Sequence, residues 1–176
     1  NRSQEYCKET RFRVDEADQI IVIPTLLSQV RSDKTSQSIV KFNLPEPKAY
    51  IVGTPLSMEF MRLVTRDDWT IDELGRFFKR YMSLLERMLR ELGVSQNLSK
   101  KEDKLPGLFF DVIPQNIIIG NDGTPQIIDS EWELCEEIEL GMCIFRSVRL
   151  MLAELTRIGC HIDGRKFSQI DFVKEV

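Results

Sequence analysis

An α+β fold is what the amino-acid sequence predicts, with a small antiparallel sheet in front and helices behind it. Residues 1–53 contain short apolar runs separated by polar and proline-containing turns, which is typical of strands. Residues 54–176 contain two longer apolar patterns with helical spacing and, between them, a hairpin pattern. We therefore expect a reduced sheet lobe with a hinge over residues 1–53 and a mainly helical lobe with a β-hairpin over residues 54–176.

The front sheet is expected to begin with two strands joined by a polar turn. In the segment TRFRV, Phe12 and Val14 lie on one face of an alternating pattern. The turn DEAD leads into QIIVIPTLL, a strand that Pro24 ends or confines to a sheet edge, because proline has no amide hydrogen to donate. The other expected front segments are a polar loop or short irregular helix at 28–38 and extended runs at 39–44 and 48–53.

A long amphipathic helix is expected to follow, starting after Thr70. Thr70 and Glu73 have the spacing of a capping box, in which each side chain bonds an amide of the other residue. Gly93 is a natural helix end, and the polar segment 95–104 is expected to be a mobile linker. The apolar residues of this helix recur at helical spacing: Ile71, Leu74, Phe77, Phe78, Tyr81, Leu85, Met88, Leu89 and Leu92.

A hairpin pattern with oxygen-bearing side chains at both ends comes next. Two apolar runs flank the turn residues Asp122 and Gly123 in NIIIGNDGTPQIID, which begins at Asn116 and ends at Asp129. Asn116 and Asp129 should be neighbours in an antiparallel pair, and Asp111 precedes Asn116 by five residues. Carboxylate and amide oxygens suit Mg²⁺ held against a polyphosphate, and a further carboxylate can orient or deprotonate a hydroxyl.

A second helix is expected over 141–158, ended by Gly159. Its basic residues Arg146 and Arg149 are expected on a solvated face rather than in a phosphate-binding clamp. Trp132, just after the hairpin, is expected to anchor that segment in the core.

Composition narrows the class of function. The net charge is −4 over 176 residues, without the basic stripe that nucleic-acid binding requires. No apolar run approaches the ~20 residues that a membrane-spanning helix needs, so no transmembrane segment is expected. The four cysteines lack the spacing of metal ligands, which favours reduced, mostly buried thiols in a cytoplasmic protein. His161 is expected in a loop after a helix.

The hairpin and its flanks resemble a known family. Asp111-x-x-x-x-Asn116, a hairpin and then IID ending at Asp129 are similar to the catalytic loop and metal-binding aspartate of the protein-kinase-like fold. The ending IDSEW resembles the small-molecule branch, the aminoglycoside and choline phosphotransferases. FDVIPQNIII, IIDSEWE and FRSVRLML together resemble kinase-like modules found beside methyltransferases and glycosyltransferases in bacterial surface-polysaccharide assembly, such as the O-antigen methyltransferase–kinases. The resemblance covers about residues 105–155, with a weaker one over 48–93.

The resemblance implies a role for each of these side chains. Asp111 would be the catalytic base, while Asn116 and Asp129 would hold Mg²⁺ against the phosphates of ATP. Glu131, two residues further on, would assist at the metal. Backbone groups in the segment that follows the front strands would meet the adenine: Tyr50, Ile51 and Gly53.

Some parts of the family pattern differ in this chain. Phe109 stands two residues before Asp111, where the family usually has His, and there is no glycine-rich phosphate loop. Lys8 and Lys41 are the candidates for the family's strand lysine. The front part leaves hardly any room for the helix that carries the glutamate partner of that lysine.

These implications favour an ATP- and Mg²⁺-dependent phosphotransferase that acts on a hydroxyl of a small molecule or a glycan end. The resemblance further implies one module of a larger protein of lipopolysaccharide or other surface-polysaccharide biosynthesis, in the cytoplasm or peripheral at the inner face of the membrane. The alternative is a non-catalytic kinase-like module that binds or scaffolds a methyltransferase or glycosyltransferase. A third reading is an α+β interaction domain of other ancestry. The sequence does not identify the acceptor, the choice between ATP and GTP, or the oligomeric state.

Overall fold

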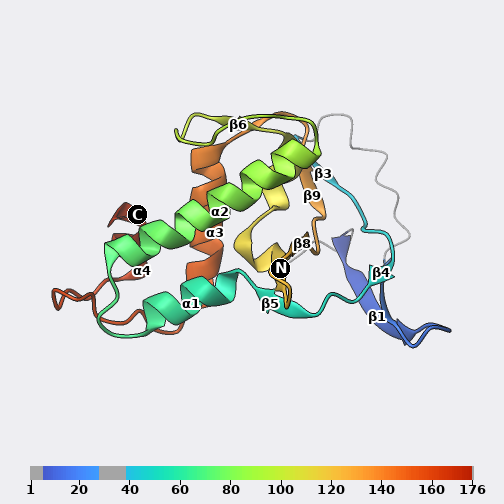
Figure 1. The fold of residues 1–176 in the computed structure, drawn as a ribbon, viewed down its shortest axis with the longest axis horizontal. Helices are drawn as coiled ribbons and strands as arrows, with labels where there is room; N and C mark the ends of the chain where they lie inside the picture. Colours follow the sequence, from blue (N-terminus) through green and yellow to red (C-terminus); the bar gives the residue numbers. More distant parts are fainter. Residues whose placement is uncertain (1–5, 28–38, 176) are drawn as a thin grey trace.

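The computed structural model describes residues 6–27 and 39–175 of the chain. Within these residues, small antiparallel sheets and four α-helices make up the fold, so the α+β class is confirmed. Figure 1 shows the helices gathered on one side, the strands β1 and β4 on the other, and β8 and β9 between them. The segment 28–38, expected to be a polar loop or a short irregular helix, lies outside the described residues.

The N-terminal sheet consists of β1 (Lys8–Val14), β2 (Ile20–Leu26) and β4 (Lys48–Ala49), in the order β1-β2-β4. The expected strand is confirmed as β1, although its residues from Thr10 to Val14 are all exposed. β2 is the central strand, and it continues through Pro24 instead of ending there. β4 pairs with β2 only at Ile21 and Val22. Pro24 therefore lies where β2 has a strand on one side only, so the missing amide hydrogen leaves no gap in a ladder.

The other front strands pair with elements of the second part of the chain. β3 (Val40–Phe42) pairs with β9 (Trp132–Leu134), and β5 (Gly53–Pro55) pairs with β7 (Ile117–Gly120). The expected front sheet is therefore smaller than predicted, because strands this short carry no pattern that selects their partner. At Gly53 the two backbones come so close that a Cβ would overlap the carbonyl oxygen of Ile119.

The predicted hairpin is confirmed. β7 and β8 (Pro125–Ile127) are antiparallel, and Ile117 lies opposite Ile127. Gly123 in the turn has a φ of 80°, which glycine adopts without steric cost. A further short pair, β6 (Lys104–Leu105) with β10 (Ile138–Glu139), was not predicted.

The long helix is confirmed as α2 (Ile71–Glu91), including its capping box. The amide of Glu73 donates to Thr70 Oγ1 over 3.2 Å, and the amide of Thr70 donates to Glu73 Oε2 over 3.0 Å. Gly93, with a φ of 79°, follows the helix end as expected. Two short helices were missed: α1 (Ser57–Thr65) and α4 (Gln169–Glu175).

The second predicted helix is shorter than expected. It forms α3 (Leu140–Ala153) and ends well before Gly159. The amide of Gly159 instead donates to the carbonyl of Val64, and its own carbonyl accepts a hydrogen bond from the indole of Trp69. Tertiary bonds to the end of α1 and the loop after it therefore draw this segment out of the helical path.

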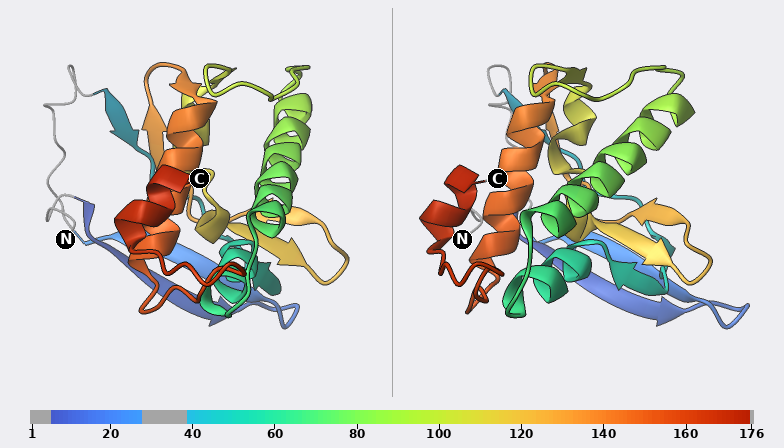
Figure 2. Two further views of the ribbon diagram at one scale, coloured as in Figure 1. Left: turned by 90° about the vertical axis from the view of Figure 1, so that its left-hand side faces the viewer. Right: turned by 60° about the vertical axis from the view of Figure 1, so that its left-hand side comes forward.

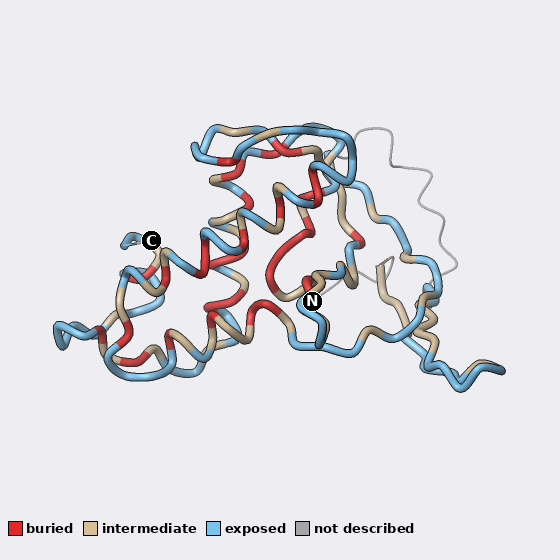
Figure 3. The backbone as a smooth tube through the Cα atoms, viewed as in Figure 1, coloured by how far each residue is buried: buried red, intermediate tan, exposed pale blue. Residues whose placement is uncertain are grey.

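The hydrophobic core lies between the helices and the loop that precedes the hairpin, as the red segments of Figure 3 show. His161 is buried in a loop after α3, where its ring packs edge-on against Trp69 with 4.9 Å between centroids. The two views of Figure 2 show α3 and α2 side by side with the hairpin beyond them. The largest fully buried side chains are Trp69, Tyr81, Phe60, Phe109 and Phe172.

The polar segment 95–104 is held to the helices more closely than a mobile linker would be. Leu98 is buried, and its amide donates to the carboxylate of Glu86 over 2.8 Å. Asp103 accepts amide hydrogen bonds from Ser99 and Lys100. Among the described residues, no helix combines the length and apolar character that crossing a membrane requires.

Candidate functional site

A loop of two 3-10 turns, Gly107–Asp111 and Pro114–Asn116, leads from the helices into the hairpin. Phe109 is buried in the core, and the hydroxyl of Tyr81 donates to the carbonyl of Val112 over 2.6 Å. The loop is therefore fastened to α2 on its inner side. Phe109 contributes to this attachment through its burial.

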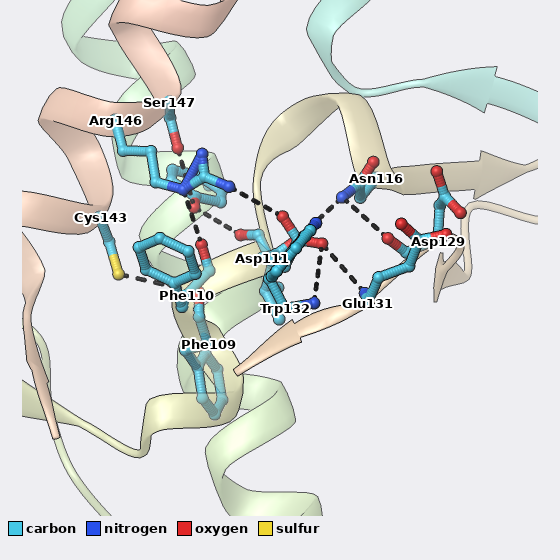
Figure 4. A network of polar contacts seen from close by, with 12 residues as sticks. Phe109, Phe110, Asp111, Asn116, Asp129, Glu131, Trp132, Cys143, Arg146 and Ser147 are labelled. Atoms are coloured by element: carbon cyan, nitrogen blue, oxygen red, sulfur yellow. Dashed lines mark hydrogen bonds and ion pairs between the residues drawn. The ribbon is translucent and has the colours of Figure 1, made fainter. Parts of the chain in front are cut away.

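Asp111 is buried, and its carboxylate accepts hydrogen bonds on both oxygens (Figure 4). Oδ2 accepts from the amides of Glu131 and Trp132, over 3.0 and 3.4 Å. Oδ1 accepts from the guanidinium of Arg146 over 3.0 Å. These donors hold the carboxylate in a single orientation, with 7% of its side chain exposed.

Arg146 belongs to this site, so the expectation that it lies on a solvated helix face is wrong. Its Nε donates to the carbonyl of Phe110 over 3.1 Å, and its guanidinium lies 4.3 Å from the centre of the Phe110 ring. The long side chain reaches from α3 across to the loop, which helical spacing alone does not reveal. Arg149 is exposed, as predicted.

Asn116 joins the two ends of the site. Its side-chain amide donates to the carbonyl of Asp111 over 2.9 Å and to the carbonyl of Asp129 over 3.4 Å. The expected proximity of Asp111, Asn116 and Asp129 is therefore present, as Figure 4 shows. Asp129 has a φ of 52°, a left-handed conformation that Asp adopts more readily than most residues, and this turns the chain away from the hairpin.

Lys8 reaches the site from the N-terminal sheet, 121 residues away in sequence. It forms ion pairs with both Asp129 and Glu131. Burial lowers the pKa of Lys8, but the hydrogen bonds and charges of Asp129 and Glu131 outweigh burial and leave that pKa above its ordinary value. Lys41, the other candidate, is exposed on β3 opposite Glu133.

A second lysine lies close enough to Asp129 to feel its charge. Lys48 donates to the carbonyl of Ile127 over 3.0 Å, and burial lowers its pKa although the charge of Asp129 opposes this. Burial also raises the pKa of Glu131; Lys8 counteracts the rise and the negative charge of Asp129 adds to it. Two lysines and two carboxylates therefore share one partly buried region, which would attract a phosphate group together with a cation.

A cavity of about 290 Å³ opens between the N-terminal sheet and the hairpin. Tyr50 and Ile51, which the resemblance assigns to the adenine, line it, whereas Gly53 lies in β5 and pairs with Gly120. Its walls are mainly apolar, and its charged lining residues are Lys8, Glu46, Lys48 and Asp129. Among the lining residues are Phe12, Val22 and Ile51 on one side, Ile118 and Ile128 on the other, and Lys8 and Asp129.

A second cavity of about 300 Å³ also has Asp129 in its wall. Asp111, Asn116, Trp132 and Arg146 line it as well. Asp129 is therefore common to an apolar cavity and a more polar one, and Asp111 belongs to the polar one. This places two compartments next to one carboxylate, as a reaction between two ligands requires.

The residues at this point fit a magnesium ion that is partly held by phosphates. Within 6–27 and 39–175, no group of three or more His, Cys, Asp and Glu side chains is placed to hold a metal alone. Mg²⁺ commonly uses one or two carboxylates with substrate phosphates. The carboxylate of Asp129 is 44% exposed, and Asn116, whose amide nitrogen is bonded to two carbonyls, keeps its oxygen for another ligand.

Comparison with known proteins gives no relatives: no protein-family model, no curated protein and no solved structure matches this chain. The geometry of the site is therefore the basis of the functional interpretation. Sequence reasoning grouped Asp111, Asn116 and Asp129, but it missed Arg146 and Lys48. The local sequence PEPKAY does not indicate a role for Lys48. That role depends on its hydrogen bond to the carbonyl of Ile127, which is distant in the sequence.

Proposed function

We propose that this chain is a protein-kinase-like domain that binds Mg·ATP and transfers its terminal phosphoryl group to a hydroxyl. One observation carries the proposal: the mainly apolar cavity between the N-terminal sheet and the hairpin is also lined by Lys8, Lys48 and Asp129. Such a cavity accepts a flat base, and its charged residues accept phosphates and a cation. The sequence resemblance adds the class of acceptor, a small molecule or a glycan end.

The nucleotide would lie with its base between the two walls of the cavity. Tyr50 and Ile51 follow β4 directly, so their backbone groups can meet the edge of the base. Lys8 and Lys48 would contact the phosphates, because both line the cavity together with Asp129. Positioning and charge neutralisation of this kind account for most of the catalysis in phosphoryl transfer.

Asn116 and Asp129 would hold the magnesium ion, which neutralises phosphate charge when bound. Asp111 would orient the acceptor hydroxyl and receive its proton, because it lines the second cavity next to Asp129. Arg146 fixes the direction of the Asp111 carboxylate. In this proposal, Lys8, Lys48, Asn116 and Asp129 bind the nucleotide and its metal ion, while Asp111 faces the acceptor.

Thermal unfolding with and without ligand tests this proposal. Millimolar Mg·ATP should raise the melting temperature more than ATP with a chelator or Mg²⁺ alone, because a ligand of the folded state stabilises it by mass action. Asp129→Ala should remove the Mg²⁺-dependent part of the shift. Glu137→Gln removes an exposed carboxylate outside the cavity and serves as the control. If Mg·ATP leaves the wild-type melting temperature unchanged, the proposal is wrong.

A second candidate function is nucleotide binding without phosphoryl transfer. The bonds to Asp111 favour it, since three donors occupy its carboxylate and little of that side chain is exposed. Slow hydrolysis of ATP by water separates the two candidates. An active phosphotransferase should hydrolyse ATP with Mg²⁺, and Asp111→Asn should slow this at unchanged nucleotide affinity. Tight binding with no hydrolysis and no effect of Asp111→Asn would favour the binding module.

A further inference from the structure

We propose that Glu131 is a positioning residue that holds Lys8 at the nucleotide cavity, and that it is not a ligand of the magnesium ion. The role rests on the proposed function, since a fixed lysine is of use where phosphates bind. It differs from the sequence-based expectation that Glu131 assists at the metal.

Burial separates the two carboxylates that contact Lys8. The side chain of Glu131 is 1% exposed, whereas that of Asp129 is 44% exposed. A hydrated cation that arrives with a nucleotide reaches Asp129 from the cavity, but it would have to displace Lys8 to reach Glu131. Magnesium gives up its water reluctantly, so the exposed carboxylate is the preferred ligand.

The backbone of Glu131 is fixed as well as its side chain. Its amide donates to Asp111 Oδ2 over 3.0 Å, and its carbonyl accepts a hydrogen bond from the amide of Asn43 over 2.7 Å. Glu131 is therefore held at its amide, its carbonyl and its carboxylate. A side chain on such a backbone can define the position of the lysine it binds.

The contacts form a closed ring around the site. Lys8 contacts Glu131 and Asp129, the amide of Glu131 bonds Asp111, and Asn116 bonds the carbonyls of Asp111 and Asp129. Lys8 alone in this ring comes from the N-terminal sheet. Glu131 thereby connects the sheet that forms one cavity wall to the loop that carries Asp111.

Within the described residues, the glutamate partner of Lys8 is a local neighbour of Asp129. In protein kinases, the partner of the strand lysine is a glutamate on a separate helix. Among residues 6–27 and 39–56 there is no α-helix that could supply one. Glu131 lies two residues after Asp129, so the segment that ends the hairpin provides both the carboxylate for the metal and the carboxylate for the lysine.

Unfolding by urea of single and double variants tests the pairing directly. Lys8→Met should lower the midpoint, because it leaves Glu131 buried without the lysine's charge. Adding Glu131→Gln to Lys8→Met should recover most of that loss, since a neutral side chain then replaces the buried charge. Adding Asp129→Asn instead should recover much less, because water already solvates Asp129. Equal recovery in both double variants, or none in either, overturns the proposal.

Nucleotide affinity measured with Mg²⁺ and with a chelator tests whether Glu131 is a ligand of the magnesium ion. Glu131→Gln should weaken binding by the same factor in both conditions, because it loosens Lys8 and leaves the metal ligands in place. Asp129→Asn should abolish the gain in affinity that Mg²⁺ provides. Loss of that gain in Glu131→Gln would show that Glu131 is a metal ligand. If the wild type binds no nucleotide, the proposed function fails, and the urea experiment still decides whether Glu131 holds Lys8.

Discussion

The helical part and the N-terminal sheet differ in what holds them in place. Phe60 on α1 is fully buried against aromatic neighbours, whereas Phe12 on β1 is 63% exposed and contacts Tyr50 at the edge of the cavity. The helices have a core of their own. The N-terminal sheet contacts the end of the hairpin through the ion pairs of Lys8 and the hydrogen bond of Lys48 to the carbonyl of Ile127. Because the N-terminal sheet has few buried contacts, a ligand bound in the cavity should stabilise this sheet more than the helices.

The largest expected effect comes from truncating the core. Phe60→Ala should lower the free energy of unfolding by about 3–5 kcal/mol, because it leaves a cavity among Phe77 and Phe172. Phe12→Ala should change it by no more than about 0.5 kcal/mol. Urea unfolding measures both. Under the proposed function, Phe12→Ala should weaken Mg·ATP binding and Phe60→Ala should not; similar losses of stability in the two variants would contradict the comparison.

The next effect concerns the joint between α3 and the loop of Asp111. Arg146→Met should cost about 2 kcal/mol, less than for a fully buried pair, because the amides of Glu131 and Trp132 still bond Asp111. Arg149→Met, an exposed neighbour on the same helix, is the matched control. Chemical denaturation should show the loss only for Arg146→Met. A loss of the same size in Arg149→Met would mean that the charge of α3, and not the bond to Asp111, matters.

A smaller effect is expected at the start of α2. Thr70→Ala removes one half of the capping box and should lower the free energy of unfolding by about 1 kcal/mol. Ser83→Ala changes a hydroxyl in the middle of the same helix, where it bonds the carbonyl of Lys79. Thermal unfolding should show a clear decrease for Thr70→Ala alone. Equal decreases would mean that the cap adds nothing to a helix already fixed by its core.

The smallest effect should appear in the acid range, at the exposed loop after α3. Asp163 has a pKa far below its ordinary value, because it accepts hydrogen bonds from the amide of Arg165 and from the side chains of His161 and Arg165. A carboxyl with a lowered pKa in the folded state stabilises the fold above its unfolded pKa, near 3.8, and this contribution is lost as pH falls below it.

Asp163→Asn should therefore make the fall of the melting temperature between about pH 4 and pH 2 shallower than in the wild type. Glu137→Gln removes the same charge from another exposed position and controls for net charge. An unchanged pH profile in Asp163→Asn would show that these hydrogen bonds add no stability in solution.

Sequence reasoning succeeded where the signal is local. The spacing of Thr70 and Glu73 and the apolar pattern after them gave α2, and the turn at Gly123 gave the hairpin. The hairpin in turn brought Asn116 and Asp129 together, because the ends of an antiparallel pair are neighbours. The helix α3 ended early because Gly159 bonds to Val64, a contact that no local pattern contains.

The amino-acid sequence by itself determined the α+β class, the main helix and the group of Asp111, Asn116 and Asp129. Only the tertiary structure decided which lysine joins them, that Arg146 bonds Asp111, and that Glu131 is buried against Lys8. The physical reason is range. Hydrophobic spacing, caps and turns act over a few residues, whereas the contact of Lys8 with Asp129 closes a loop of more than a hundred residues and depends on the packing of the whole fold.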